Sequence, residues 1–282
     1  MERVDIVIIG AGPAGLSAAV TAAARGKKAA VFYAGDNYLR KAERVDNYLG
    51  FYHISGAQLM EQFMEHAKAM GITPQKGRVS NLLSMGDGFM LNVSGEIIEA
   101  NSVIMTTGVS KAKEIPGEKE FLGRGVSYCA TCDGMLYRGK SAVVWGMSND
   151  AAGEANFLHE IGVNVHFVGT KQRTQGLHPE ITVSPGALTE ILGEDNVRAA
   201  RAGSDGLPCD GVFILRDSIA PSTLMEGLEL QNGYIKVDAS MKTNIKGLFA
   251  AGDCVGKPLQ ISKAVGEGLV AALSAVEYLD SH

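Results

Sequence analysis

The sequence predicts an α/β fold with parallel sheets, because one order of strand, turn and helix occurs twice along the chain. The apolar run 5–9 precedes a glycine-rich turn at 10–15, and the alanine-rich stretch 16–25 precedes a second apolar run at 29–33. This order is typical of a βαβ unit, whose two strands run parallel. It recurs over residues 141–168, so we expect a second unit of this kind inside the chain.

A further strand is expected near the C-terminal end. Residues 247–253 form a short apolar run that ends in Gly-Asp, and the pattern of residues 261–279 predicts a helix after the next loop. The chain has 282 residues, of which 35 are glycine and 46% are hydrophobic. Since that length is large for one ordinary domain, we expect two domains.

The composition argues against two classes of partner. The formal net charge is −5 and no long basic run occurs, which argues against nucleic acid. No uncharged apolar run reaches the roughly 18 residues that a membrane-spanning helix needs. The apolar run that follows the charged N-terminal residues is too short for a signal peptide. We therefore expect a cytoplasmic protein with no membrane partner.

The glycines of the first turn predict dinucleotide binding rather than a purely structural turn. Gly10 permits the tight turn, Gly12 lets the backbone approach a pyrophosphate, and Gly15 lets the helix pack closely on the strand. The phosphates would then lie at the helix N-terminus. The acidic residue usual at the end of the second strand is replaced by Tyr33, with Asp36 three residues later, which leaves the adenosine contacts open.

A closely spaced cysteine pair suggests redox chemistry. Cys129 and Cys132 can close a small ring reversibly, and Asp133 is placed to carry protons to and from a departing thiolate. Half of a zinc site and a pair of inert thiols are the alternatives. A zinc site needs a second ligand pair, but Cys209 and Cys254 are isolated, and none of the six histidines shows triad or metal spacing. We therefore expect no metal site.

These motifs together resemble the low-molecular-weight thioredoxin reductases over nearly the whole chain. The segments that carry the resemblance are 10–15, 45–51, 107–108, 129–133, 250–253 and 266–268. Their order is specific, because in that family the cysteine pair lies in the second domain rather than in the first.

The resemblance implies two Rossmann-like FAD/NAD(P)-binding domains of the three-layer ββα type, the second inserted into the first. The FAD-binding domain would comprise residues 1–110 and 243–282, and the redox-cysteine domain residues 111–242. FAD is the implied cofactor, and a homodimer is the implied assembly.

The resemblance also implies roles for individual residues. The pyrophosphate would be held by the first turn, Asn47 would approach the isoalloxazine, and Asp253 would bind the ribityl chain. Gln260 and Ile261 would close over the ring. The complete set of cofactor-binding residues expected on this basis is Gly10, Gly12, Pro13, Ala14, Gly15, Asn47, Val79, Thr107, Gly108, Gly252, Asp253, Gln260 and Ile261.

The turn of the second βαβ unit, at residues 146–151, departs from the pattern of an NADPH-binding member of the family. Ser148 occupies the position of the second glycine, and Met147 and Asn149 add bulk beside it. The next strand leads to Lys171 and Arg173 but not to an adjacent arginine pair, so a bidentate clamp for a ribose phosphate is missing. Either this domain has lost its pyridine nucleotide or the site has drifted and still works.

The departures are similar to those of the ferredoxin-dependent flavin thioredoxin reductases and their nucleotide-independent relatives. The shared segments are 44–51, 121–126, 210–218 and 256–258. This subgroup implies that reduced ferredoxin supplies electrons one at a time to FAD, which reduces the cysteine pair. Cys132 would be the thiol nearer the flavin, and Cys129 would attack the disulfide of thioredoxin. A basic patch for ferredoxin could include Lys111, Lys113 and Lys119, although a solvated charge cluster is the better explanation of these lysines.

Three rival functions stay open at this point. An NADPH-dependent thioredoxin reductase would be bleached by NADPH. A flavin-bearing redox sensor without turnover would bind its partner without reducing thioredoxin. A ferredoxin-NADP reductase of related fold would have no use for the cysteine pair.

Overall fold

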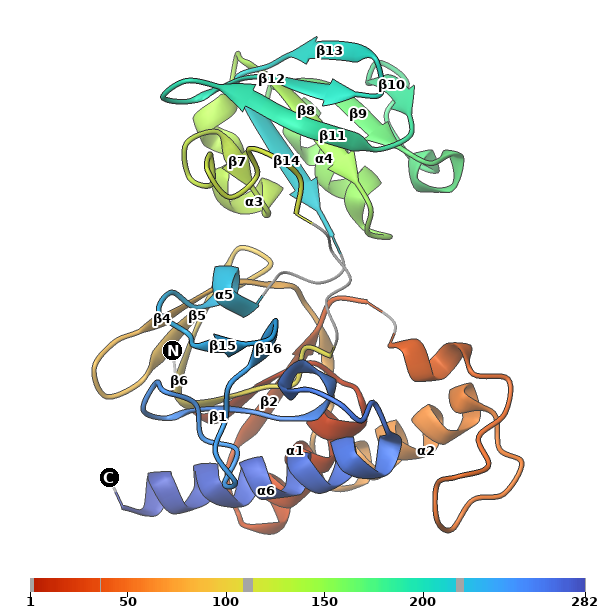
Figure 1. The fold of residues 1–282 in the computed structure, drawn as a ribbon, viewed down its shortest axis with the longest axis vertical. Coiled ribbons are helices and arrows are strands. Elements are labelled where there is room, and N and C mark those ends of the chain that lie inside the picture. Colours follow the sequence, from red (N-terminus) through yellow and green to blue (C-terminus); the bar gives the residue numbers. More distant parts are fainter. Residues whose placement is uncertain (1–2, 36, 109–113, 217–220, 282) are drawn as a thin grey trace. The chain divides into compact units, whose positions relative to one another are not determined.

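The computed structural model describes residues 3–35, 37–108, 114–216 and 221–281. For Tyr38 and Cys132 it describes the backbone but not the side chain. The chain forms two compact units (Figure 1). The first unit combines Met1–Ser110 with Ala220–His282, and the second is Lys111–Ile219. The α/β fold with parallel sheets, predicted from the repeated βαβ pattern, is confirmed. In the described part of the chain, no helix is both long and apolar enough to cross a membrane.

The second boundary between the units differs from the expected one. Residues 220–242 belong to the first unit, whereas the sequence analysis places them in the inserted domain. Local bonds explain this, because Glu229 N donates to Asn244 Oδ1 at 3.0 Å and Asn244 Nδ2 donates to Gly227 O at 2.8 Å. These bonds tie the segment to the part of the chain that leads into the last strand of the first sheet. The sequence pattern does not predict this boundary, because the segment 220–242 contains only very short helices and strands.

The first unit is a sheet covered by helices. Its strands are β1 (Val4–Ile9), β2 (Ala29–Tyr33), β3 (Gln75–Lys76), β4 (Val79–Ser84), β5 (Phe89–Val93), β6 (Glu96–Met105) and β17 (Leu248–Ala250), with a separate pair of β15 (Leu230–Gln231) and β16 (Tyr234–Ile235). Its helices are α1 (Pro13–Ala24), η1 (Tyr38–Lys41), α2 (Gly56–Ala69), α5 (Pro221–Leu224), η4 (Gly252–Val255) and α6 (Ile261–Asp280).

Strand β6 joins two parts of this sheet. The strand order is β3-β2-β1-β6-β5-β4, and β17 also pairs with β6. The C-terminal half of β6 lies parallel to β1 and to β17, whereas its N-terminal half is antiparallel to β5. The carboxyl ends of β1 and β17 therefore meet at one edge, where ligands bind in open α/β sheets.

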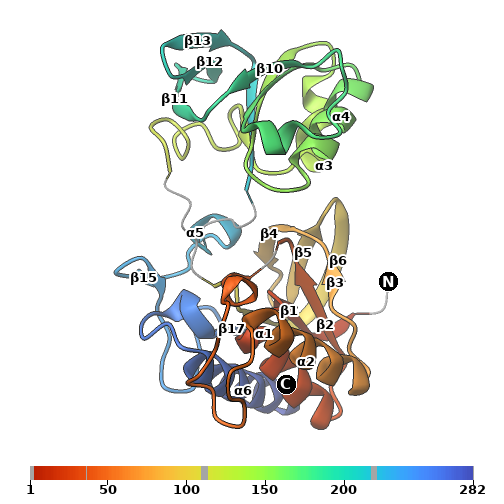
Figure 2. The ribbon, with the colours of Figure 1, turned by 90° about the vertical axis from the view of Figure 1, so that its right-hand side faces the viewer.

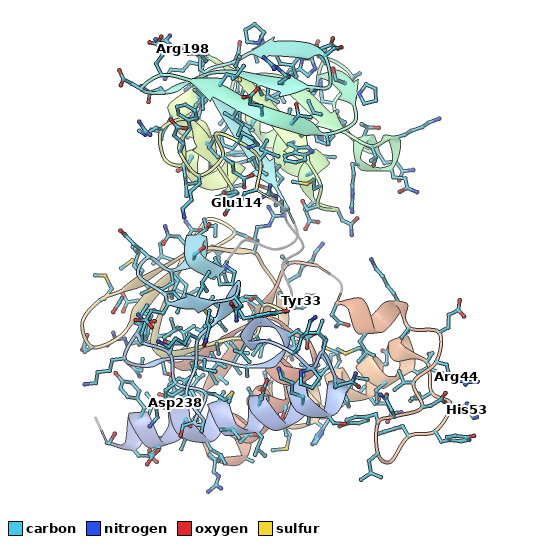
Figure 3. The ribbon with its side chains drawn as sticks, viewed as in Figure 1. Tyr33, Arg44, His53, Glu114, Arg198 and Asp238 are labelled. Carbon is cyan, nitrogen blue, oxygen red and sulfur yellow. The ribbon has the colours of Figure 1, made fainter. Side chains whose placement is uncertain are left out.

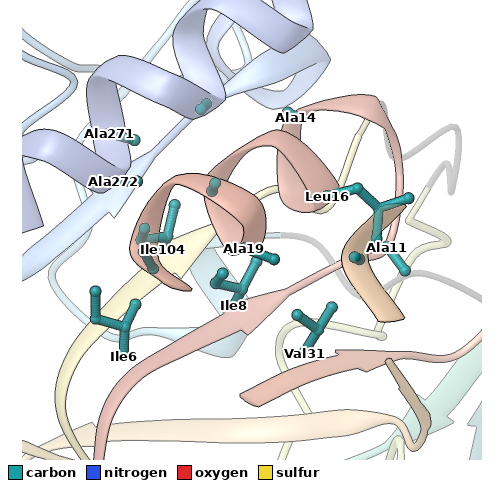
Figure 4. Packing of buried hydrophobic residues seen from close by; sticks show 14 of the residues in the cluster. Ile6, Ile8, Ala11, Ala14, Leu16, Ala19, Val31, Ile104, Ala271 and Ala272 are labelled. Carbon is teal, nitrogen blue, oxygen red and sulfur yellow. The ribbon is translucent and has the colours of Figure 1, made fainter. Parts of the chain in front are cut away.

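Small side chains let α1 and α6 pack closely on each other and on β1. Ala14, Ala19, Ala271 and Ala272 are buried in one cluster with Ile8 (Figure 4). A Cβ placed on Gly268 would lie 2.1 Å from Ala14 O. The alanine-rich sequence of both helices is thus a packing requirement, and it fixes the start of α1 against α6.

The second unit contains a parallel sheet and an antiparallel one (Figure 2). Its strands are β7 (Val126–Ser127), β8 (Ser141–Gly146), β9 (Asn164–Gly169), β10 (Thr182–Pro185), β11 (Leu188–Gly193), β12 (Val197–Ala202), β13 (Asp205–Pro208) and β14 (Gly211–Leu215). Its helices are α3 (Ala130–Asp133), η2 (Gly134–Tyr137), α4 (Ala151–Glu160) and η3 (Lys171–Thr174). The parallel order is β10-β9-β8-β14-β7, and β11, β12 and β13 form the antiparallel sheet.

Candidate functional site

The turn between β1 and α1 requires glycine at two of its positions. Gly10 has φ +118°, and a Cβ there would lie 2.3 Å from Thr106 O. A Cβ on Gly15 would lie 1.9 Å from Gly10 O. The Thr106 hydroxyl lies 3.0 Å from the carbonyl oxygens of both Ile9 and Gly10, which holds the turn against the end of β6. Gly10 and Gly15 are therefore needed for packing.

Gly12 is different, because it faces open space. A Cβ at this position would meet no atom within 4 Å. Gly12 caps α1 without a side chain, and Pro13 follows in the first turn of the helix. The first N–H groups of a helix have no intrahelical partners, so those at the start of α1 are available to an anion. The space and the donors suit a pyrophosphate.

The Gly-Asp sequence after β17 lies against this turn. Gly252 has φ +85°, and a Cβ there would lie 2.8 Å from the Cβ of Ala14. Gly252 N donates to Glu267 Oε2 at 2.9 Å, and Lys263 Nζ pairs with the same carboxylate at 3.0 Å. Burial raises the pKa of Asp253, while the charge of Lys263 acts in the opposite direction.

Lys263 is a residue that the sequence analysis missed. Its ammonium group donates to Gly252 O at 3.1 Å and to Gly256 O at 2.8 Å. It therefore fixes both ends of η4, the segment that presents Asp253. The spacing of Lys263 and Glu267 on α6 was the available signal, because residues four apart on a helix are neighbours.

Two of the predicted cofactor residues from distant parts of the sequence lie together. Asn47 Nδ2 donates to Gln260 Oε1 at 2.9 Å. Gln260 is the N-cap of α6, which begins at Ile261. The loop that carries Asn47 is held by Asp46, whose carboxylate accepts from Arg44 Nε at 2.7 Å and lies 3.0 Å from His53 Nδ1. Figure 3 shows Arg44 and His53 beside each other on this loop.

The remaining predicted cofactor residues lie at two further places in the first unit. Thr107 and Gly108 lie just beyond β6, after Thr106. Val79 is the first residue of β4; it is buried and pairs with Val93. Tyr33 ends β2 (Figure 3), and its carbonyl accepts from Gly77 N at 2.9 Å. Asp36, the suggested replacement for the acidic residue, lies outside the described residues.

In the second unit, Cys129 is buried and disulfide-bonded. It immediately precedes α3, and its Sγ lies 3.4 Å from Thr131 Oγ1. Cys132 lies within α3, and its side chain is outside the described part of the chain. Asp133 N donates to Cys129 O at 3.3 Å, which closes the first turn after Cys129.

Ser127 connects Cys129 to Asp133. Its hydroxyl donates to Asp133 Oδ2 at 2.7 Å and accepts from Cys129 N at 3.1 Å. A second carboxylate, Glu154 of α4, accepts from Ala130 N at 3.1 Å. The sequence analysis missed Ser127 and Glu154, because neither belongs to the cysteine motif. The one signal was that Ser127 lies two residues before Cys129.

The turn after β8 is closed by the protein itself. Met147 N and Ser148 N donate to Leu215 O at 2.9 Å and 2.8 Å. Ser148 is only 1% exposed, and its hydroxyl has no hydrogen-bond partner among the described residues. A Cβ on Gly146 would lie 2.0 Å from the Phe167 ring. This turn therefore lacks the open space found at Gly12.

Two arginines near this turn, Arg173 and Arg216, are already paired. Arg173 donates to Asn149 Oδ1. Arg216 forms a bidentate pair with Glu118, which is fully buried, and lies 5.5 Å from the centroid of the Trp145 ring. Of the lysines suggested as a ferredoxin patch, Lys119 is exposed, whereas Lys111 and Lys113 lie outside the described residues.

The remaining cysteines are free and buried. Burial raises the pKa of Cys209 to about 12 and that of Cys254 to about 11. Thiols that stay protonated at neutral pH are poor nucleophiles and poor metal ligands.

The fold and the site together define a class of oxidoreductase, and comparisons with known proteins agree. The family model described as pyridine nucleotide-disulphide oxidoreductase matches residues 4–268. The thioredoxin reductase of Bacillus subtilis (strain 168) is 32% identical, with 98% of this chain and 95% of the relative covered. The chain therefore belongs to the pyridine nucleotide-disulphide oxidoreductase family, as a thioredoxin reductase-like flavoprotein.

Solved structures are similar over the whole chain. A ferredoxin-flavin thioredoxin reductase from Clostridium acetobutylicum is 45% identical, with a TM-score of 0.92 and full coverage of both chains. The atypical thioredoxin reductase TRi from Desulfovibrio vulgaris Hildenborough is 33% identical, with a TM-score of 0.71 and 100% and 99% of the two chains covered. The resemblance inferred from the sequence motifs is thus confirmed.

Proposed function

We propose that this chain is a thioredoxin reductase that binds FAD, takes its electrons from reduced ferredoxin and passes them through Cys129 and Cys132 to thioredoxin. The observation that carries the choice of donor is the closed turn of the second unit. Met147 N and Ser148 N, which would face a pyrophosphate in a nucleotide-binding turn, both donate to Leu215 O. A pyridine nucleotide would have to break these bonds to bind there.

The two turns of the chain provide an internal comparison. Gly12 faces open space, whereas its counterpart Ser148 is buried. Near the second turn, Arg173 is bonded to Asn149 and Arg216 is paired with Glu118. To bind a ribose phosphate, Arg173 or Arg216 would have to give up its present partner. The contrast supports a dinucleotide at the first turn and none at the second.

The residues of the first unit fit FAD. The start of α1 would hold the pyrophosphate at Gly12, Pro13 and Ala14, and Asp253 would bind the ribityl hydroxyls from η4. The bonded pair of Asn47 and Gln260 would lie at the isoalloxazine. When bound, FAD supplies a carrier that accepts electrons singly and delivers them in pairs.

Transfer of two electrons to the disulfide requires a proton donor close to the sulfur atoms. When the disulfide bond between Cys129 and Cys132 breaks, two electrons enter and each sulfur leaves as a thiolate that must be protonated or stabilised. The Asp133 carboxyl would deliver the proton, since Ser127 holds it beside Cys129. The cofactor residues belong to the first unit and Cys129 to the second, so electron transfer requires the flavin and the disulfide to be close to each other at that step.

The dithiol then reduces the substrate by thiol–disulfide exchange. The Cys129 thiolate attacks one sulfur of the thioredoxin disulfide, and a mixed disulfide forms as the other sulfur leaves with a proton. The Cys132 thiolate next attacks Cys129, which restores the disulfide and releases thioredoxin as a dithiol. Two molecules of reduced ferredoxin, each oxidised by one electron, balance one disulfide reduced with two protons. The ferredoxin-flavin name of the relative from Clostridium acetobutylicum supports this donor.

The proposal is tested by thioredoxin turnover with reduced ferredoxin under anaerobic conditions. The Cys129→Ser and Cys132→Ser variants should each lose thioredoxin reduction while the bound flavin is still reduced by ferredoxin. Cys209→Ser is the matched control, because Cys209 is a free, buried thiol of the same unit. Thioredoxin reduction that survives both substitutions would contradict the role of the pair. The homodimer expected from the resemblance stays a prediction, which light scattering of the purified protein checks.

A further inference from the structure

Two histidines and a glutamate that the sequence pattern does not relate lie together in the second unit. His159 belongs to the last turn of α4, and His178 and Glu180 belong to the connection between η3 and β10. One nitrogen from each imidazole and one carboxylate oxygen all lie within 4.8 Å of one another. Both histidines are partly buried, and Glu180 is exposed. The cluster is separate from the cysteine motif and has no part in the proposed reaction.

The distances suit a small divalent cation. His159 Nε2 lies 3.3 Å from Glu180 Oε2, and the two imidazole centroids are 4.5 Å apart. With zinc bonds of about 2.0–2.2 Å, two ligand atoms of a tetrahedral site are separated by roughly 3.3–3.5 Å. The His159–Glu180 distance already has this value. Glu180 N donates to His178 Nδ1 at 3.3 Å, a long bond that the nitrogen can exchange for a metal ion.

The connection that carries His178 is fixed to α4 before any ligand binds. Asn156, three residues before His159, accepts from His178 N at 2.8 Å through Oδ1 and donates to Gly176 O at 2.8 Å through Nδ2. Ile181 N donates to His178 O at 3.0 Å, and the Ile181 side chain is buried in the core of the unit. Because both sides of the cluster are held, little ordering is needed on binding.

The local electrostatics also favour a cation. The last carbonyl groups of α4 give its C-terminal end a partial negative charge close to His159. The Glu180 carboxylate adds a full negative charge. Imidazole nitrogens select zinc, copper, nickel or cobalt over calcium and magnesium, which prefer sites made of oxygen.

We propose that His159, His178 and Glu180 form a binding site for a divalent transition metal of the zinc class, with water in the remaining position. Bound metal would link the end of α4 to the connection between η3 and β10. Leu158, the neighbour of His159, contacts the segment that follows the cysteine motif, because a Cβ on Gly134 would lie 2.7 Å from Leu158 Cδ2. The site therefore reinforces the helix on which the cysteine segment packs.

The test is zinc titration by calorimetry of the full-length, flavin-loaded protein in its oxidised form, in which the disulfide offers no thiolate. One zinc ion per chain is expected. His159→Ala and the milder Glu180→Gln should each weaken zinc binding by roughly 10-fold to 100-fold or more, the range seen even for groups that only support a metal site. His66→Ala, which removes an exposed histidine of the first unit, and Cys209→Ser, which removes a free buried thiol and leaves the disulfide intact, should leave the affinity unchanged.

X-ray absorption of the zinc-loaded protein identifies the ligands. Two imidazoles with only nitrogen and oxygen donors are expected. Absence of zinc uptake by the unchanged protein would overturn the proposal, as would equal uptake by Glu180→Gln or a signal from sulfur ligands. If His159→Ala fails to fold, the exposed Glu180→Gln still decides the question.

Discussion

Ser127 donates a hydrogen bond of 2.7 Å to the Asp133 carboxylate, and the same hydroxyl accepts from the backbone of Cys129 at 3.1 Å. One small side chain thus sets the distance between the proposed proton donor and the disulfide. Proton transfer depends strongly on such positioning, because the donor must lie within hydrogen-bond reach of the leaving group. Ser127 acts through Asp133 and Cys129, and we regard it as a positioning residue.

Ser127→Ala should slow thioredoxin reduction by roughly tenfold or more, since a hydrogen bond to a charged group contributes about 1.5–3 kcal/mol and about 1.4 kcal/mol corresponds to one factor of ten in rate. Asp133→Asn should slow it by roughly 100-fold or more, because it removes the acid itself. Stopped-flow measurement of flavin reduction by ferredoxin and of thioredoxin turnover separates the steps. Ser127→Thr, which keeps a hydroxyl, should restore part of the rate. Loss of flavin binding in Ser127→Ala would indicate a general structural role instead.

Gly12 and Gly15 form a matched pair for testing the cofactor turn. Gly12→Ala places its methyl group in open space, so the folded chain should tolerate it while the space for a pyrophosphate shrinks. Gly15→Ala places a methyl group 1.9 Å from Gly10 O, so we expect destabilisation on the order of 3 kcal/mol. Flavin content per chain and denaturant unfolding of the apoprotein measure the two effects. Full flavin occupancy with unchanged affinity in Gly12→Ala would contradict the assignment.

Ser148→Gly tests why the second turn is closed. If the serine side chain alone blocked the nucleotide, glycine would restore NADPH binding. We expect no restoration, because the N–H groups of Met147 and Ser148 are held by Leu215 O whatever the side chain is. The absorbance of the flavin band after anaerobic addition of NADPH is the measurement. Bleaching in Ser148→Gly that the unchanged chain lacks would show that side-chain bulk is the cause.

Removal of one partner of the buried Glu118–Arg216 pair should strongly destabilise the second unit. Tyr128 Oη also donates to Glu118 at 2.9 Å, so Glu118→Gln leaves a buried guanidinium without its countercharge. Breaking such a pair costs about 3–5 kcal/mol. The control is Glu190→Gln, because the Glu190–Arg201 pair is partly exposed and is expected to contribute at most about 1 kcal/mol. Equal unfolding midpoints in urea would refute the distinction.

The sequence was sufficient for the parts of the fold that rest on local pattern. The expected helix at 261–279 is α6 (Ile261–Asp280), and the expected strand at 29–33 is β2 (Ala29–Tyr33). Both follow from continuous apolar runs with clear ends. The boundary at residue 242 was wrong, because the contacts of 220–242 depend on Asn244 and on elements too short to leave a periodic signal.

The residues of the candidate site likewise divide into those that local sequence predicts and those that it does not. Gly10, Gly15 and the cysteine motif were predictable because turn geometry and thiol spacing are local properties. Lys263, Ser127 and Glu154 were not, because each acts through a backbone group that only the folded chain brings near. The His159 cluster shows the limit most clearly, since its side chains come from a helix and a loop that tertiary packing joins.

The central claim is that the second unit binds no pyridine nucleotide, so that neither NADPH nor NADH reduces the FAD. The most direct measurement is an anaerobic titration of the flavin-loaded protein, in which the flavin band is followed with NADPH, then NADH, then reduced ferredoxin, in the presence of thioredoxin. We predict no bleaching by either nucleotide, followed by bleaching and formation of thioredoxin thiols with ferredoxin. Rapid bleaching by micromolar NADPH would contradict the account and identify the chain as an NADPH-dependent thioredoxin reductase.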